Sequence, residues 1–168
     1  MKKLMLFAVV VGAMACFLSA AEGPTGAKSY QIRNCKFDQL LRPRDANSSD
    51  GTRIVLYPAQ PWKCMTWKLL PAGDAAFQLQ NHFTQKTFEA KTNEAGAMLV
   101  QVPFDRNSSK RPAWKFEKLP DGFYRITEVA SGRCLAASSK EAVTLAPAKD
   151  QPEQEWELIE TDPAKLTM

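Results

Sequence analysis

The chain has 168 residues, of which 45% are hydrophobic and 24% charged, and its formal net charge at pH 7 is +4. That length suits one domain or two small ones. The hydrophobic content is too high, and the charges are too balanced, for a disordered chain. A single histidine, His82, argues against histidine-rich metal sites and leaves few groups for acid–base catalysis.

The N-terminus has the pattern of a secretory signal peptide over residues 1–21. Two lysines follow Met1, and the uncharged, mostly apolar stretch 4–18 is short for a membrane span. The small residues 19–21 then offer a cleavage site. We therefore expect a mature chain that begins near Glu22, is secreted or periplasmic, and contains no transmembrane segment.

Two other interpretations of this segment stay open. Cys16 follows a small residue and could carry the lipid of a lipoprotein, although Ala13 stands where such signals usually have leucine. The other is an uncleaved membrane anchor, but the small residues at the end of the segment disfavour it. Signal cleavage removes two lysines and one cysteine, so the net charge falls from +4 to +2. The cysteines that remain are odd in number and permit at most one internal disulfide: Cys35, Cys64 and Cys134.

Short runs of alternating apolar and polar residues recur along the mature chain, and no long helical period interrupts them. Such runs begin at Tyr30, Phe77 and Tyr124, which follow one another at steps of 47 residues. A period of two predicts β-strands. Clusters of Gly, Pro, Asn, Asp and Ser separate the runs and predict turns.

The tryptophans recur at nearly the same step. Trp67 and Trp114 lie 47 residues apart, and Trp156 follows 42 residues later because the third copy is shorter within its hairpin. A step of this size indicates one supersecondary unit copied several times. Units of ~40 residues bury too little surface alone and must share a core. Three four-stranded units suit an all-β barrel with pseudo-threefold symmetry.

The repeats resemble those of the ricin-type β-trefoil lectin domain. That family ends each repeat with Gln-x-Trp, and the third repeat here has Gln154-Glu-Trp156. The first two repeats depart from the motif, with Met65-Thr-Trp67 and Pro112-Ala-Trp114. Two further phrases are similar to the family's strand phrases: Asp50-Gly-Thr-Arg-Ile-Val-Leu-Tyr57 and Gly132-Arg-Cys-Leu135.

The resemblance implies one β-trefoil domain over about 30–160, after a flexible lead-in of residues 22–29 and before a tail of residues 161–168. The three repeats are expected over about 30–73, 74–121 and 122–160. Their tryptophans, Trp67, Trp114 and Trp156, are expected to pack in the core where the repeats meet.

The same resemblance implies where a sugar would bind. In ricin-type repeats an acid follows the Cys-Leu phrase, an aromatic ends the third strand, and an amide precedes the Trp motif. Carboxylates and amides pair with sugar hydroxyls, and an aromatic ring stacks on the apolar face of the sugar. In the second repeat these positions are Glu89, Phe104 and Arg111. Glu89 would accept hydrogen bonds from hydroxyls, Phe104 would be the stacking platform, and Arg111 would be a donor or an anion clamp. A slip of one residue would put Pro103 in place of Phe104, and the plain alternative is a solvated Glu89 with a core Phe104.

The first repeat keeps less of this set. Its positions are Arg42, Tyr57 and Cys64, so that only the aromatic survives. Trp62, which has no counterpart in the other repeats, suits an exposed stacking platform and a lid on the core equally well. Three residues could complete a site with Tyr57: Asp45, Gln60 and Trp62.

The third repeat keeps no part of a sugar site. The same positions there are Ala136, Ala146 and Glu153, which supply neither a platform nor the expected acid and amide. The second repeat is therefore the main candidate.

The family's usual disulfide is also incomplete. Cys134 occupies the first of its two positions, but the second, near Ala148, is not cysteine. Because the first and last strands of a trefoil repeat pair antiparallel, we expect a Cys35–Cys64 disulfide in the first repeat. No close pair of cysteines predicts a zinc site.

No catalytic motif accompanies these features. The chain lacks G-x-S-x-G, a P-loop and H-E-x-x-H, and His82 is expected to be a surface residue. We therefore expect a non-catalytic carbohydrate-binding or glycoconjugate-binding module without a cofactor, and no nucleic-acid partner. The alternative is a protein-interaction trefoil with decayed sugar sites, such as an accessory or delivery subunit of a toxin, or an inhibitor. A third possibility is a domain that targets a separately encoded enzyme to a surface.

Overall fold

The computed structural model describes residues 23–24, 26–105, 108 and 112–167. The expected signal peptide with Cys16, and the candidate Arg111, lie outside the described residues. Within the described part, the structure consists of β-strands and short 3₁₀ helices without any α-helix. None of its helices is long and apolar enough to cross a membrane. The strands are β1 (Ser29–Asn34), β2 (Gln39–Pro43), β3 (Ile54–Tyr57), β4 (Thr66–Pro71), β5 (Ala76–Asn81), β6 (Thr87–Ala90), β7 (Leu99–Val102), β8 (Trp114–Lys118), β9 (Tyr124–Glu128), β10 (Cys134–Ser139), β11 (Ala142–Ala146) and β12 (Trp156–Glu160).

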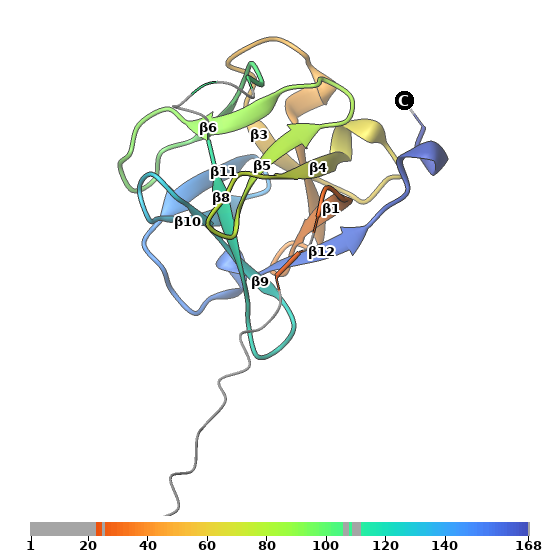
Figure 1. Ribbon diagram of the computed structural model, residues 1–168. Helices are drawn as coiled ribbons and strands as arrows, with labels where there is room; N and C mark the ends of the chain where they lie inside the picture. Colours follow the sequence, from red (N-terminus) through yellow and green to blue (C-terminus); the bar gives the residue numbers. More distant parts are fainter. Residues whose placement is uncertain (1–22, 25, 106–107, 109–111, 168) are drawn as a thin grey trace, which may run out of the picture.

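Six strands close into a barrel, in which β1, β4, β5, β8, β9 and β12 pair antiparallel in that order and β12 returns to β1. The other strands form three hairpins, β2–β3, β6–β7 and β10–β11. Backbone hydrogen bonds join the hairpins to one another, as where the Gln101 N–H donates to the Thr52 carbonyl at 2.7 Å. Figure 1 shows the first and last strands side by side, where they close the barrel. The all-β, barrel-forming architecture expected from the sequence is confirmed.

The alternating runs of the sequence form β1, β5 and β9, each of which opens a unit of four strands. In β1 the side chains of Tyr30, Ile32 and Asn34 are buried while those between them are not, because successive residues of a strand face opposite sides. The turn between β8 and β9 contains Gly122 at a φ of 93°. Few residues other than glycine adopt that conformation, so this turn needs its glycine.

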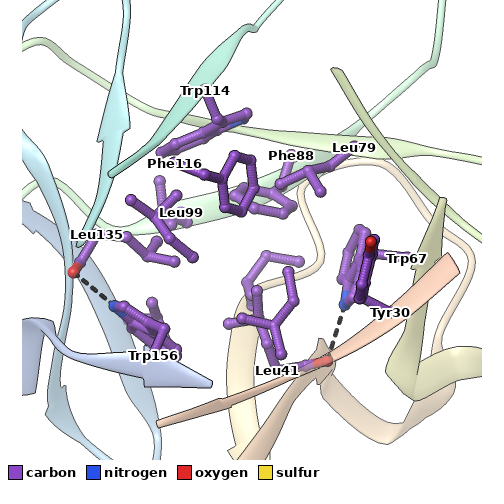
Figure 2. Packing of buried hydrophobic residues seen from close by; sticks show 14 of the residues in the cluster. Tyr30, Leu41, Trp67, Leu79, Phe88, Leu99, Trp114, Phe116, Leu135 and Trp156 are labelled. Atoms are coloured by element: carbon purple, nitrogen blue, oxygen red, sulfur yellow. Dashed lines mark hydrogen bonds between the residues drawn. The ribbon is translucent and has the colours of Figure 1, made fainter. Parts of the chain in front are cut away.

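The tryptophans of the three repeats lie fully buried in one core (Figure 2). The Trp67 Nε1–H donates to the Leu41 carbonyl at 2.9 Å, and the Trp156 Nε1–H donates to the Leu135 carbonyl at 3.0 Å. These two bonds tie each indole to the hairpin of its own repeat.

Trp114 is the exception among the three. Within the described part of the chain its indole N–H has no hydrogen-bond partner. Its ring packs against Phe88 instead, with the ring centroids 5.0 Å apart. The second repeat is therefore the one in which the bond between tryptophan and hairpin is missing.

The second repeat also departs from the 47-residue step inside its hairpin. Leu41 pairs with Leu56 in the first hairpin, whereas Phe88 pairs with Gln101 in the second. The second hairpin is thus two residues shorter between paired positions. Because the tryptophans keep their step, the segment between β7 and Trp114 is two residues longer.

This difference changes which residue corresponds to the aromatic of the first repeat. Tyr57 pairs with Leu40, and the matching pair in the second repeat is Val102 with Thr87. The alignment of Phe104 with Tyr57 is therefore wrong, and the register slips by two residues rather than one. Phe104 lies beyond the end of β7, on the loop before β8.

The predicted Cys35–Cys64 disulfide is wrong, since both residues are free thiols in the structure. Strand β1 pairs with β4 only as far as Gln31, opposite Thr66. Beyond that point β1 pairs with β12 and β2, and the Cys35 N–H donates to the Glu155 carbonyl at 2.9 Å. Divergence of the two strands therefore keeps the two thiols apart.

Candidate functional site

A pocket of about 180 Å³ lies at the second hairpin, between strands β5, β6 and β7 and the loop before β8. Glu89 and Phe104, two of the residues singled out in the sequence, both line it. The third, Arg111, is not among the described residues, but its neighbour Pro112 lines the pocket. The described lining residues are Gln78, Thr87, Glu89, Val102, Pro103, Phe104, Asp105, Ser108 and Pro112.

The pocket joins a polar strand face to an aromatic loop. Thr87 and Glu89 stand two residues apart on β6 and so point to the same side of the strand. Glu89 and Phe104 are both half-buried, so each keeps part of its surface for a ligand. Carboxylate oxygens accept hydrogen bonds from hydroxyls, and an aromatic ring covers C–H groups. This combination suits a ligand that is hydroxylated on one side and apolar on another.

A second, wider hollow of about 520 Å³ adjoins the pocket. Lys68 and Gln80, which pair across β4 and β5, line it together with Phe104 and Asp105. Because Phe104 and Asp105 line both hollows, the loop forms a shared wall between them. A ligand longer than one ring could therefore extend over this wall.

In the first repeat an arginine covers the aromatic. The Arg42 guanidinium lies over the Tyr57 ring at 3.8 Å from the centroid, and the Tyr57 and Trp62 rings stack at 6.0 Å. Arg42 is only 7% exposed. A buried cation thus occupies one face of the Tyr57 ring, which itself stays 38% exposed.

The loop around Trp62 has a structural role of its own. Trp62 is half-buried and packs against the small cluster that contains Cys64, which favours the lid over the free platform. The Lys63 N–H donates to the Thr167 carbonyl at 3.0 Å, so the C-terminal tail holds this loop. The remaining first-repeat candidates are exposed, and neither lines the second-repeat pocket: Asp45 and Gln60.

In the third repeat the same positions, Ala136, Ala146 and Glu153, offer no aromatic plate for a ring. Ala136 is buried, and the Glu153 carboxylate accepts a hydrogen bond from the Lys36 ammonium at 2.6 Å. That hydrogen bond lowers the pKa of Glu153. The Gln154 side chain donates to the Pro147 carbonyl at 2.8 Å and so braces the loop after β11. Among the described residues, no group of three or more His, Cys, Asp or Glu side chains could hold a metal ion.

Among the pocket residues that sequence reasoning missed, two are buried and polar: Gln78 on β5 and Thr87 on β6. Both are buried polar residues, with exposed fractions of 4% and 3%. A polar side chain at a buried strand position was the available signal. This signal could not identify a binding residue, because the sequence does not show which residues surround a buried strand position.

The single histidine lies after β5 and does not line the pocket. His82 is half-buried, and its Nε2 lies 2.7 Å from the Ser29 hydroxyl. Burial lowers the pKa of His82, and the charges of Lys68 and Lys63 lower it further. The folded protein therefore holds His82 in its neutral form to a lower pH than the unfolded chain does.

This shift predicts a loss of stability in mild acid. The ordinary pKa of histidine is about 6.5, so below that pH the unfolded chain takes up a proton that the folded state resists. The free energy of unfolding should be highest above about pH 6.5 and should fall as the pH drops through the lower folded-state pKa. His82→Gln removes this contribution, and no second histidine can replace it. Urea unfolding at about pH 7.5 and 5.5 should show a larger loss for the wild type; equal losses would contradict the prediction.

Comparison with known proteins gives no match to any family model and none to a curated sequence. Solved structures do match. A designed protein with threefold symmetry, ThreeFoil, superposes with a TM-score of 0.72 at 21% identity, over 78% of this chain and 97% of the other. A ricin B-like lectin of Macrolepiota procera, solved with lactose, gives a TM-score of 0.69 at 18% identity, over 82% of this chain and 99% of the lectin.

The chain has the β-trefoil fold. The trefoil is also similar to a chain of the Haemophilus ducreyi cytolethal distending toxin, with a TM-score of 0.62 and 19% identity, over 79% of this chain and 83% of that chain. Identities this low show the common fold, so the function of the trefoil has to be argued from its own pocket.

Proposed function

We propose that this trefoil is a secreted, non-catalytic carbohydrate-binding module that works through the pocket of its second repeat. The observation that carries the proposal is the meeting of Glu89 and Phe104 at one pocket of about 180 Å³. Phe104 reaches it from a loop and Glu89 from a strand, although 15 positions separate them in the chain.

The chemistry of the pocket supports a sugar. A sugar ring needs hydrogen-bond acceptors for its hydroxyls and an apolar plate for its C–H face, and Glu89 and Phe104 supply one of each. Most of the described lining residues are polar or proline, and the pocket is partly open, so little apolar area is buried on binding. Affinity at one such site should be weak, about micromolar to millimolar in Kd.

The other repeats support a single working site. Arg42 occupies one face of the Tyr57 ring in the first repeat, and the third repeat has no aromatic at Ala146. A lectin solved with lactose shares this fold over nearly all of its length. The proposal therefore places one sugar site on the trefoil, in contrast to a threefold-symmetric set.

The experiment is a glycan array probed with the purified trefoil without its first 21 residues. Multivalent display compensates for weak single-site affinity. We expect binding to a related group of glycans, with competition by the corresponding free sugar at about millimolar concentration. A blank array from protein that unfolds cooperatively in urea would overturn the proposed function.

A protein-interaction trefoil is the second candidate. It is favoured by the covered site of the first repeat, by the blank third repeat, and by the likeness to a chain of a cytolethal distending toxin. As an accessory or delivery subunit, the trefoil would bind a protein through its loops. A blank array together with a defined stoichiometric complex, isolated with a secreted partner, would support this function over the first.

A further inference from the structure

We propose that the outer wall of the barrel carries an oxyanion site, in which Ser29, Lys68 and His82, with Lys63 beside them, bind a sulfate or phosphate group. The site is separate from the sugar pocket, since none of the four residues lines that pocket. All four lie in strands and turns that the structure describes. The inference goes beyond the proposed function and does not depend on it.

The strands β1, β4 and β5 bring these side chains to one face of the barrel wall. Strand β4 runs between β1 and β5 (Figure 1). Ser29 lies opposite Lys68 in the β1–β4 pair, so the two side chains leave the same face of the sheet. That face is the outer one, because Trp67 and Leu69, the neighbours of Lys68 on β4, are fully buried in the core.

His82 reaches this face from the other side of β4. It follows β5 directly, and its backbone N–H donates to the Thr66 carbonyl of β4 at 2.9 Å. Its Nε2 nevertheless lies 2.7 Å from the Ser29 hydroxyl oxygen on β1. The imidazole therefore crosses the outer face of β4, the face on which Lys68 also stands.

The group is rich in hydrogen-bond donors. A serine hydroxyl has one donor, a lysine ammonium has three, and a protonated imidazole has two. Sulfate and phosphate groups present several oxygens that accept such bonds, and bonds between ionised partners are the strong ones. A carboxylate, with two oxygens in one plane, would use fewer of these donors.

The charges that act on His82 are positive. Lys68 and Lys63 each lower its pKa, in addition to the effect of burial, and no carboxylate of the described chain contributes to that shift. Neither lysine forms an ion pair with another described residue. An anion beside the imidazole would therefore be attracted by both ammonium groups.

Two acids lie near this group and leave its charge positive. Glu160 pairs with Lys28, at the start of β1, at 2.9 Å. Asp105 lines the wider hollow on the β5 side of Lys68, whereas Ser29 lies on the β1 side. The lysines outnumber these acids, and a protonated histidine adds a further positive charge.

Protonation of His82 and binding of the anion should reinforce each other. When Nε2 carries no proton, it accepts a hydrogen bond from the Ser29 hydroxyl and occupies that donor. When His82 is protonated, its Nε2–H donates to the Ser29 oxygen, and the hydroxyl proton is free for the anion. Linkage then requires that a bound anion raise the pKa of His82, and that affinity for the anion rise as the pH falls through that pKa.

NMR of the purified protein, prepared without a histidine tag, tests this coupling. His82 is the only histidine, so it supplies all the imidazole signals. Its pKa is measured in sodium chloride and in sodium sulfate of the same ionic strength. We expect a higher pKa in sulfate, and sulfate binding about fivefold tighter at about pH 5 than at about pH 7.5. An equal pKa in the two salts would overturn the proposal.

Variants locate the site. Ser29→Ala and Lys68→Gln should each weaken sulfate binding about tenfold. Lys68→Gln should also raise the pKa of His82 in chloride, because a cation that lowers this pKa is gone. Lys118→Gln, at an exposed position at the end of β8, loses the same charge and should bind sulfate as the wild type does. An equal loss in Lys118→Gln and Lys68→Gln would indicate general charge attraction and would overturn the site.

Further probes distinguish a free anion from a sulfated glycan: inorganic phosphate, galactose and galactose 6-sulfate. If galactose 6-sulfate binds no more tightly than the inorganic ions, the site takes the free anion. Tighter binding that is lost in Lys68→Gln assigns it to a sulfated sugar. Binding that is lost in Glu89→Gln and kept in Lys68→Gln would overturn the site and leave the proposed function standing. A blank glycan array with sulfate binding intact would do the reverse.

Discussion

Trp156→Ala is expected to lower the free energy of unfolding by about 3–5 kcal/mol, the usual cost of truncating a large buried aromatic. Trp156 is fully buried where the repeats meet, and it donates a hydrogen bond to the Leu135 carbonyl at 3.0 Å. The substitution opens a cavity and leaves that carbonyl unpaired. A loss of this size is a large part of the stability of a small domain, and urea unfolding measures it.

A pair of milder variants separates the cavity from the hydrogen bond. Trp156→Phe removes a donor that the Leu135 carbonyl uses, whereas Trp114→Phe removes an N–H that has no partner in the described part of the chain. Both variants remove a similar volume. We expect Trp156→Phe to be more destabilising by about 1–3 kcal/mol. Equal losses would show that the indole bond contributes nothing to stability.

Glu89→Gln is expected to weaken sugar binding about 10-fold to 150-fold, because a hydrogen bond to a charged acceptor contributes roughly 1.5–3 kcal/mol. Phe104→Ala should weaken it by a similar factor through loss of the stacking plate. Both residues are half-buried and line the same pocket. The fold should tolerate either change, since neither side chain belongs to the buried core. Titration of each variant with the best glycoside from the array measures the effect.

Matched controls for these variants lie in the other repeats. Tyr57→Ala removes the aromatic that Arg42 covers, and Glu153→Gln changes an acid that is paired with Lys36. Neither control residue lines the second-repeat pocket, so both variants should keep the wild-type Kd. Loss of binding in Tyr57→Ala with retention in Phe104→Ala would move the sugar site to the first repeat.

Much of the architecture was predictable because it repeats. The strand starts at Tyr30, Phe77 and Tyr124, and the period of two that follows them, predict the strands that form the barrel. The burial of Trp67, Trp114 and Trp156 was predictable as well, because large aromatic side chains that recur at similar steps occupy equivalent positions in each repeat. Both follow from the burial of apolar side chains, which any copy of the unit must satisfy.

The alignment of Phe104 with Tyr57 was wrong for a reason that cannot be seen in the sequence. The second hairpin is two residues shorter than the first, and the loop after it is two residues longer. The two changes cancel over the whole repeat, so the step between tryptophans stays at 47. Strand pairing reveals the shift, because register depends on contacts between strands and not on chain distance.

The amino-acid sequence by itself determined the all-β class, the three repeats, the buried tryptophans, and Glu89 and Phe104 as candidates. Tertiary structure decided that these two residues share one pocket, that Arg42 covers Tyr57, and that the thiols of the first repeat stay apart. It also brought in Thr87. The physical reason is that periodicity records which face of a strand is buried, whereas a binding site depends on where strands and loops from distant parts of the chain end in space.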